Sequence, residues 1–239
     1  MSALVQVVVI GLVCLLVGAG LEVHRRSRVR ARGDTLDVWC AGQGWRRETD
    51  HAVARTVGAR VAAPLLPHGR PEHLVAGATA DGREAVAVGW THQTHSGGIG
   101  EDSSSTTTTH HDVVVALRLA GTHPELRIGP HPAFVLFDRD RARVCRTGHP
   151  DVDHRLRIVA DDGAHAAAVA PHDVLVHLAA DPSRTSWCLR GDWLFGRRRG
   201  VLEPAGLEAL LAQAQWLADR ADRVLTVPAG SPAPGPRTR

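Results

Sequence analysis

The residues best suited to metal chemistry lie at the two ends of one polar segment. His92 and His95 begin this segment, and His110, His111 and Asp112 end it. Imidazole nitrogens and carboxylate oxygens are zinc ligands in proteins. A metal site needs fixed ligand positions, however, and the residues between these groups are a low-complexity mixture rich in Gly, Ser and Thr. Because no HExxH pattern supports a zinc site, we expect solvated loop histidines, no metal ion and no cofactor.

The other candidate groups are explained by turns and surfaces. Asp161 and Asp162 precede a glycine after an expected strand, and Asp with Gly is typical of a turn. The three arginines at 197–199 fit a solvated strand end, or alternatively a basic edge that meets lipid or an acidic partner. Cys145 and Cys188 have no catalytic partner nearby in the sequence, and buried cysteine is the default expectation. We therefore predict no catalytic residues.

Composition excludes several classes of enzyme and partner. All 28 basic residues are arginine, and Lys, Asn and Tyr are absent. Without lysine the chain cannot form a Walker-type phosphate loop, a Schiff base or a kinase ion pair. The net charge is +3, and arginines near the N-terminus account for more than all of it. The remaining chain is close to neutral, which argues against a nucleic-acid partner.

The N-terminal segment has the properties of a membrane anchor. Residues 2–21 include no charged side chain, and twenty residues at about 1.5 Å each cross a hydrocarbon core of roughly 30 Å. We predict a transmembrane anchor at 1–23 and a basic juxtamembrane segment at 24–34. The membrane-proximal basic residues are Arg25, Arg26, Arg28, Arg30 and Arg32. The alternatives are a cleaved signal peptide, the reverse orientation, and a buried or peripheral helix.

The arginines also predict the orientation. Arginines beside a span remain on the cytoplasmic side, and no charge at the N-terminus opposes them. We expect a single-pass protein of the cell membrane with its N-terminus outside and its C-terminal domain in the cytoplasm. Singly placed cysteines at 40, 145 and 188 fit a reducing compartment. The same arginines can contact anionic lipid.

Residues 35–225 are expected to form one α+β soluble domain. A short helix at 35–44 is followed by irregular chain at 51–72, which contains three prolines. A hairpin pairs 73–80 with 83–90 around Asp81 and Gly82. Residues 91–111 form a flexible loop in this interpretation.

The second half of the domain predicts further strands and a long helix. Strands are expected at 113–119, 126–128, 133–137 and 155–159, a helix at 171–179, and a second hairpin from 187–190 and 193–195. Residues 204–225 have the periodicity of an amphipathic helix, and 226–239 form a disordered tail rich in Pro and Gly. The predicted fold class is therefore α+β: a transmembrane helix, a mostly antiparallel sheet and a long C-terminal amphipathic helix.

These motifs occur in a recognisable order. Gly44-Trp45 ends the first helix, and the hairpin HLVAGATADGREAVAVGW follows at 73–90. A strand ending in Ala160-Asp161-Asp162, a Trp-x-x-x-Gly-Asp hairpin at 187–192 and the final helix complete the order. The chain resembles, over nearly its whole length, a family of actinobacterial single-pass membrane-anchored proteins of unknown function. The resemblance implies no site residues.

Three functional hypotheses follow from the sequence. The first is a non-catalytic, membrane-tethered domain in the cytoplasm that acts as a scaffold and binds an unknown protein partner. The second is a domain that binds lipid or a small ligand at the membrane surface, because a curved sheet closed by a helix can enclose a pocket. The third is an enzyme, a histidine-based metallohydrolase.

Overall fold

The computed structural model describes residues 31, 33–66, 68–96, 106–131 and 143–226. The predicted anchor and its five arginines, the expected strand at 133–137 and almost all of the C-terminal tail lie outside these residues. Within them, no helix is both long and apolar enough to cross a bilayer.

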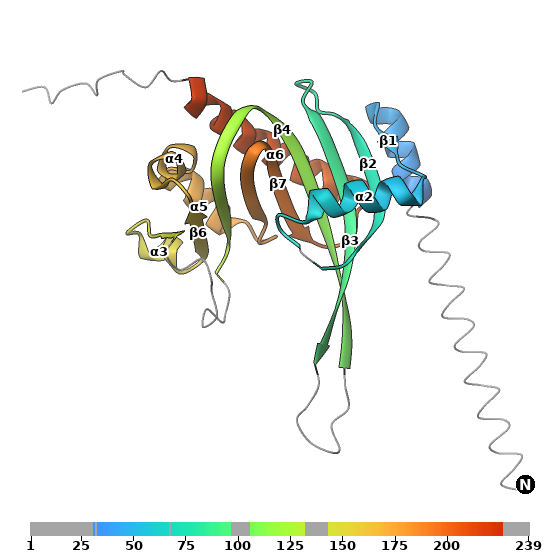
Figure 1. Ribbon diagram of the computed structural model, residues 1–239, viewed down its shortest axis with the longest axis horizontal. Helices are drawn as coiled ribbons and strands as arrows, with labels where there is room; N and C mark the ends of the chain where they lie inside the picture. The colour runs from blue at the N-terminus through green and yellow to red at the C-terminus, as the bar shows by residue number, and fades with distance from the viewer. Residues whose placement is uncertain (1–30, 32, 67, 97–105, 132–142, 227–239) are drawn as a thin grey trace, which may run out of the picture.

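One antiparallel sheet organises the domain, and this confirms the predicted α+β class (Figure 1). Its strands are β1 (Arg46–Arg47), β2 (Arg70–Ala78), β3 (Glu84–Ser96), β4 (Thr106–Pro130), β6 (Leu156–Ala160) and β5 (Val144–Cys145), in that order, with β7 (Ser186–Arg199) on the other edge of β4. The predicted hairpin is formed by β2 and β3, and the strand expected at 155–159 is β6.

A single strand of 25 residues, β4, connects the two halves of the sheet. The part of β4 at 106–117 pairs with β3, and the part at 126–130 pairs with β6. β7 follows the other edge of β4 from Arg199, opposite Asp112, to Trp187, opposite Ile128, with register shifts around His123. The strands expected separately at 113–119 and 126–128 are therefore one bent strand.

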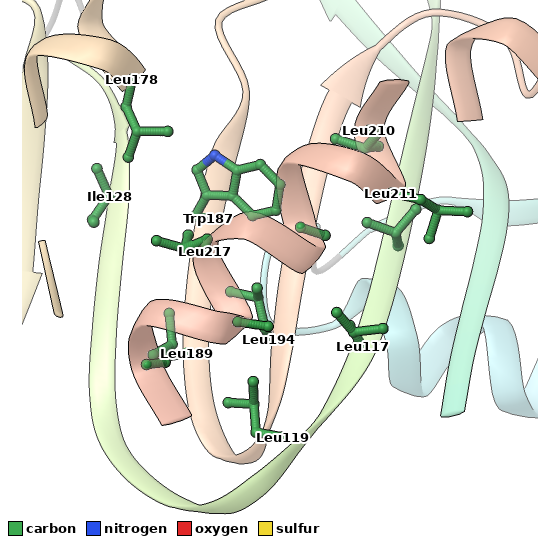
Figure 2. Packing of buried hydrophobic residues seen from close by; sticks show 14 of the residues in the cluster. Leu117, Leu119, Ile128, Leu178, Trp187, Leu189, Leu194, Leu210, Leu211 and Leu217 are labelled. Carbon is green, nitrogen blue, oxygen red and sulfur yellow. The ribbon is translucent and has the colours of Figure 1, made fainter. Parts of the chain in front are cut away.

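β7 replaces the predicted second hairpin. The chain bends at Gly191, which has φ +61°, but both arms pair with β4 and not with each other. The bent β7 lies inside the bend of β4 (Figure 2). As a result the indole of Trp187 packs against Gly196, nine positions further along the same strand.

Helices cover both faces of the sheet because the side chains of β4 alternate between them. Val113, Val115 and Leu117 face the helix at 33–43 and α6 (Pro204–Thr226). Val114 and Ala116 face α2 (His51–Ala62) on the opposite side. The periodicity placed eight residues of α6 on one face. Seven of them are buried, namely Leu207, Leu210, Leu211, Ala214, Leu217, Ala218 and Ala221, whereas Leu225 is 44% exposed.

The helix α2 corrects the expectation of irregular chain at 51–72. The Asp50 carboxylate caps its N-terminus, accepting from the backbone N–H of Ala52 at 2.7 Å. Val61 and Ala62, on one side of the helix, are buried. The prolines at 64, 67 and 71 all follow its last residue. The prolines therefore end this helix and do not prevent it.

The loop expected at 91–111 is also largely strand. β3 extends to Ser96 and β4 begins at Thr106, and their residues pair in continuous register from Thr91 with His111 to Ser96 with Thr106. Threonine favours extended backbone, and cross-strand pairs stabilise it. The low-complexity composition of this segment favoured the prediction of a flexible loop, although its two ends are paired strands.

Three short helices lie beside β6. They are α3 (Pro150–Asp153), α4 (Gly163–Val169) and α5 (His172–Ala180), of which α5 is the helix expected at 171–179. Asp162 caps α4 by accepting from the backbone N–H groups of Ala164 and His165. Asp162 is therefore the N-cap of a helix, whereas the sequence predicted only a turn at this position.

Candidate functional site

The sheet brings together three of the five residues considered as metal ligands. His92 and His110 are direct register partners, and their rings stack with centroids 4.9 Å apart. Asp112 is fully buried; its Oδ1 accepts from Nε of Arg197 at 2.9 Å, and its Oδ2 lies 3.2 Å from Nδ1 of His92. His111 contacts Thr91 instead, and the side chain of His95 lies outside the described residues.

This polar cluster joins β3, β4 and β7 where the paired extension of β3 and β4 begins. The Asp112 carboxylate is bound by a guanidinium, and Thr94 contacts Nε2 of His110 at 2.9 Å. Over the described ranges, no group of three or more His, Cys, Asp or Glu has the arrangement of a metal site. Arg197 and Arg198 are partly exposed and form polar contacts, with Arg198 donating to the carbonyl of Gly206 at 2.5 Å, whereas Arg199 is exposed as expected of a solvated strand end.

A second polar cluster joins four distant segments. Nδ1 of His123 lies 3.3 Å from Nε2 of His165, and its Nε2 lies 3.9 Å from Asp222. Asp222 also forms an ion pair with Arg83 at 3.0 Å. Burial lowers the pKa of His123, and the neighbouring His165 adds to this effect. Burial also lowers the pKa of His165, so both imidazoles favour the neutral form, and the cluster fastens α4 and α6 to the bend of β4.

Two cavities adjoin β6, α3 and the turn at 181–185. One has a volume of about 790 Å³ and a floor that includes Leu156 and Ile158. The other has a volume of about 470 Å³ and lies toward the end of α5. They share His131, His154 and Leu156 as lining residues, so we describe them together as the β6 groove.

Arginines surround the β6 groove. Arg146 and Arg157 line the larger cavity, and Arg155 and Arg184 line the smaller one. Across the described chain, Arg155 and Arg184 form no ion pair with a carboxylate. The charge of Arg146 acts on Asp153 and helps to lower the pKa of that carboxyl. Arg184 has a φ of +53°, and among the described residues it is the one non-glycine residue with a positive φ.

The two carboxylates of the groove point their oxygens at neutral donors. Asp153 accepts from the backbone N–H and hydroxyl of Thr147, both at 2.9 Å, and these bonds lower its pKa. Burial alone would raise the pKa of Asp181, but bonds from Ser183 and Thr185 more than offset this and lower it. Positive charge therefore predominates around the groove.

The sequence carried no signal for either the cluster of His123 and His165 or the β6 groove. Their residues are scattered singly, and only the bend of β4 and the short helices bring them together. Of the predicted cysteines, Cys188 is fully buried, whereas Cys145 is partly exposed and lines the larger cavity.

Comparison with known proteins reveals a likeness of fold. No family model matches the chain, and no curated protein matches it; the resemblance to an actinobacterial family stays a prediction. The crystal structure of the mycobacterial trehalose monomycolate transport factor A, TtfA, is similar with a TM-score of 0.52 and 13% sequence identity. The match covers 80% of this chain and 94% of the chain in that structure.

Proposed function

We propose that this protein is a membrane-tethered accessory factor of lipid transport that acts by binding and not by catalysis. The observation that carries the proposal is the likeness of fold to a trehalose monomycolate transport factor over 94% of that chain. The uncharged segment 2–21 supports it, because such a segment would hold the domain at a bilayer.

The domain is proposed to lie on the cytoplasmic side and to act as a scaffold for a protein partner. The polar clusters favour this role, since their members are committed to one another. Asp112 binds Arg197, and Asp222 binds Arg83. These pairs hold the curved sheet and α6 in place, which provides a rigid surface for a partner. A second candidate, direct binding of lipid, is favoured by the β6 groove.

Deletion of the gene in its source organism tests the lipid role. Cells would be pulse-labelled with radioactive acetate, and the labelled lipids of the plasma membrane and the outer envelope compared. We expect label to accumulate in the plasma membrane and to fall in the outer envelope, with total incorporation unchanged. Normal distribution, or an equal fall in both fractions, would contradict the proposal.

Complementation distinguishes tethering from mere presence of the domain. The full chain should restore the distribution, and so should a chain in which an unrelated single-span anchor replaces residues 2–21. A chain lacking these residues should not restore it. Equal rescue by all three would refute the proposed tether while leaving a lipid role in place.

A further inference from the structure

We propose that the β6 groove binds an anionic lipid with an acyl chain, of which a long-chain fatty acid is the simplest example. This inference deepens the proposed lipid role by naming the class of ligand. It commits to one occupant because the groove combines apolar side chains with uncommitted positive charge.

The larger cavity fits the acyl chain. Leu156 and Ile158 project from β6 on the same side, since alternate residues of a strand share a face, and both line the cavity. Val144 on β5 lines it as well and is 37% exposed. Leu156 and Ile158 are only 7% and 5% exposed. The apolar surface that an acyl chain would newly cover therefore belongs mainly to Val144, and covering it is favourable at about 25 cal/mol per Å². The volume of about 790 Å³ lies within the roughly 300–1,000 Å³ of small-molecule sites.

The smaller cavity fits the anionic head. Arg155 and Arg184 line it, are exposed, and are not paired with a carboxylate in the described part of the chain. A guanidinium presents several N–H donors in a planar fork that suits carboxylate and phosphate oxygens. The left-handed backbone of Arg184 is unfavourable for a residue with a Cβ, and such strain concentrates at binding sites.

The two cavities meet at His131, His154 and Leu156, so one molecule can occupy both. A ligand that binds across this junction must be amphiphilic, with its charged end beside Arg155 and Arg184 and its apolar end over Ile158. The competing occupant is the apolar segment of the chain itself at 133–137. This segment lies outside the described residues, and in the sequence it stands between His131 and Val144, which both line the groove.

Photocross-linking of the full chain tests the assignment. The protein would be placed in nanodiscs of phosphatidylcholine containing a fatty acid with a diazirine in its chain, and cross-linked peptides identified by mass spectrometry. We expect cross-links within 143–158, in addition to those within 2–21. A diazirine fatty alcohol of the same length, which lacks the charge, should label 2–21 alone.

Paired variants provide the control. Arg155→Ala/Arg184→Ala should reduce labelling of 143–158 about tenfold relative to 2–21, because two charged contacts are lost. Arg55→Ala/Arg60→Ala removes two exposed arginines from α2 on the other face of the sheet and should change nothing. Melting temperatures of both variants would verify that each is folded.

Three results would overturn the assignment. They are cross-links confined to 2–21, as expected if residues 133–137 fill the groove; equal labelling by the acid and the alcohol; and unchanged labelling of the Arg155→Ala/Arg184→Ala variant. Any of these, combined with the altered lipid distribution of the deletion strain, would refute lipid binding in the β6 groove and leave the proposed accessory role in place. Normal lipid distribution together with specific cross-linking would refute the accessory role and leave lipid binding in the groove in place.

Discussion

Replacing Gly196 by alanine probes how β7 bends inside β4. An added Cβ would lie against Cζ3 of Trp187, with Cη2 at 2.9 Å and Cε3 at 3.0 Å. Carbon atoms in contact are about 3.5–4.0 Å apart, so the indole or the strand must move by at least about half an ångström. Trp187 is only 1% exposed and is enclosed by leucines (Figure 2). Overpacking of this kind costs about 1–3 kcal/mol.

We expect the upper end of that range, because a rigid indole cannot change shape to make room. For a domain of this size, a loss of about 3 kcal/mol corresponds to a fall in melting temperature of roughly 6–12 °C. Thermal unfolding of the full chain, followed by tryptophan circular dichroism, measures it. Gly163→Ala is the matched control, since no atom lies within 4 Å of its added Cβ, and its effect should stay within about 1 kcal/mol.

A double-mutant cycle makes the geometry itself testable. Trp187→Leu removes the indole, so Gly196→Ala should cost much less in that background, with a coupling energy of at least about 1 kcal/mol. If Gly196→Ala leaves the melting temperature unchanged, or if its cost is the same with leucine at 187, the two arms of β7 do not face each other as described.

Three further predictions concern the polar groups and thiols. Asp112→Ala should lower the unfolding free energy by about 3 kcal/mol, because it leaves Arg197 without its buried partner; urea denaturation measures this, and a loss below about 1 kcal/mol would contradict it. Burial and a neighbouring imidazole lower the pKa of His123 in the folded state, so the unfolded chain binds the proton more readily. Its contribution to stability should be fully present above about pH 6.5 and be lost as the pH falls below that value. His123→Asn should flatten the dependence of melting temperature on pH, and an unchanged slope would refute the assignment. Burial also raises the pKa of Cys188 to about 11, so iodoacetamide at about pH 8 should modify Cys145 first, as peptide mass spectrometry would record; modification of Cys188 at an equal rate would exclude its burial.

The elements that the sequence predicted well are those with a local repeating pattern. The C-terminal helix shows seven buried apolar positions at helical spacing, and its bounds differ from the expected 204–225 by one residue. The hairpin around Asp81 and Gly82 is similarly local, because turn residues separate two strand-forming runs. Both patterns report directly which face is buried.

The elements that were missed depend on contacts across the chain. Helix α2 has a mixed surface of alanine and arginine, and its burial follows from packing on β2 and β3. The polar ends of β3 and β4 are strands because each pairs with the other. The bend of β7 at Gly191 has a local signal in the sequence, but the pairing of both arms with β4 has none.

The candidate site was less predictable than the fold. The histidine cluster was considered because its residues are close in sequence, yet Asp112 is committed to Arg197, which lies far along the chain. The arginines of the β6 groove stand singly among surface residues. Only the placement of α3 and the turn at 181–185 beside β6 gives them a common environment.

The continuous β4 strand has a consequence for synthesis at the ribosome. The strands that pair with its two edges are synthesised at very different times. β3 is made before β4, whereas β7, in which Arg199 pairs with Asp112, is made long after it. At about 5–20 residues per second, roughly 4–17 seconds separate the synthesis of these two residues. During that interval Val113, Val115 and Leu117 still lack α6, which packs against them in the folded domain. The order of translation therefore leaves this apolar face of β4 uncovered until α6 has been synthesised, so the folding of the sheet core is completed only at the end of the chain.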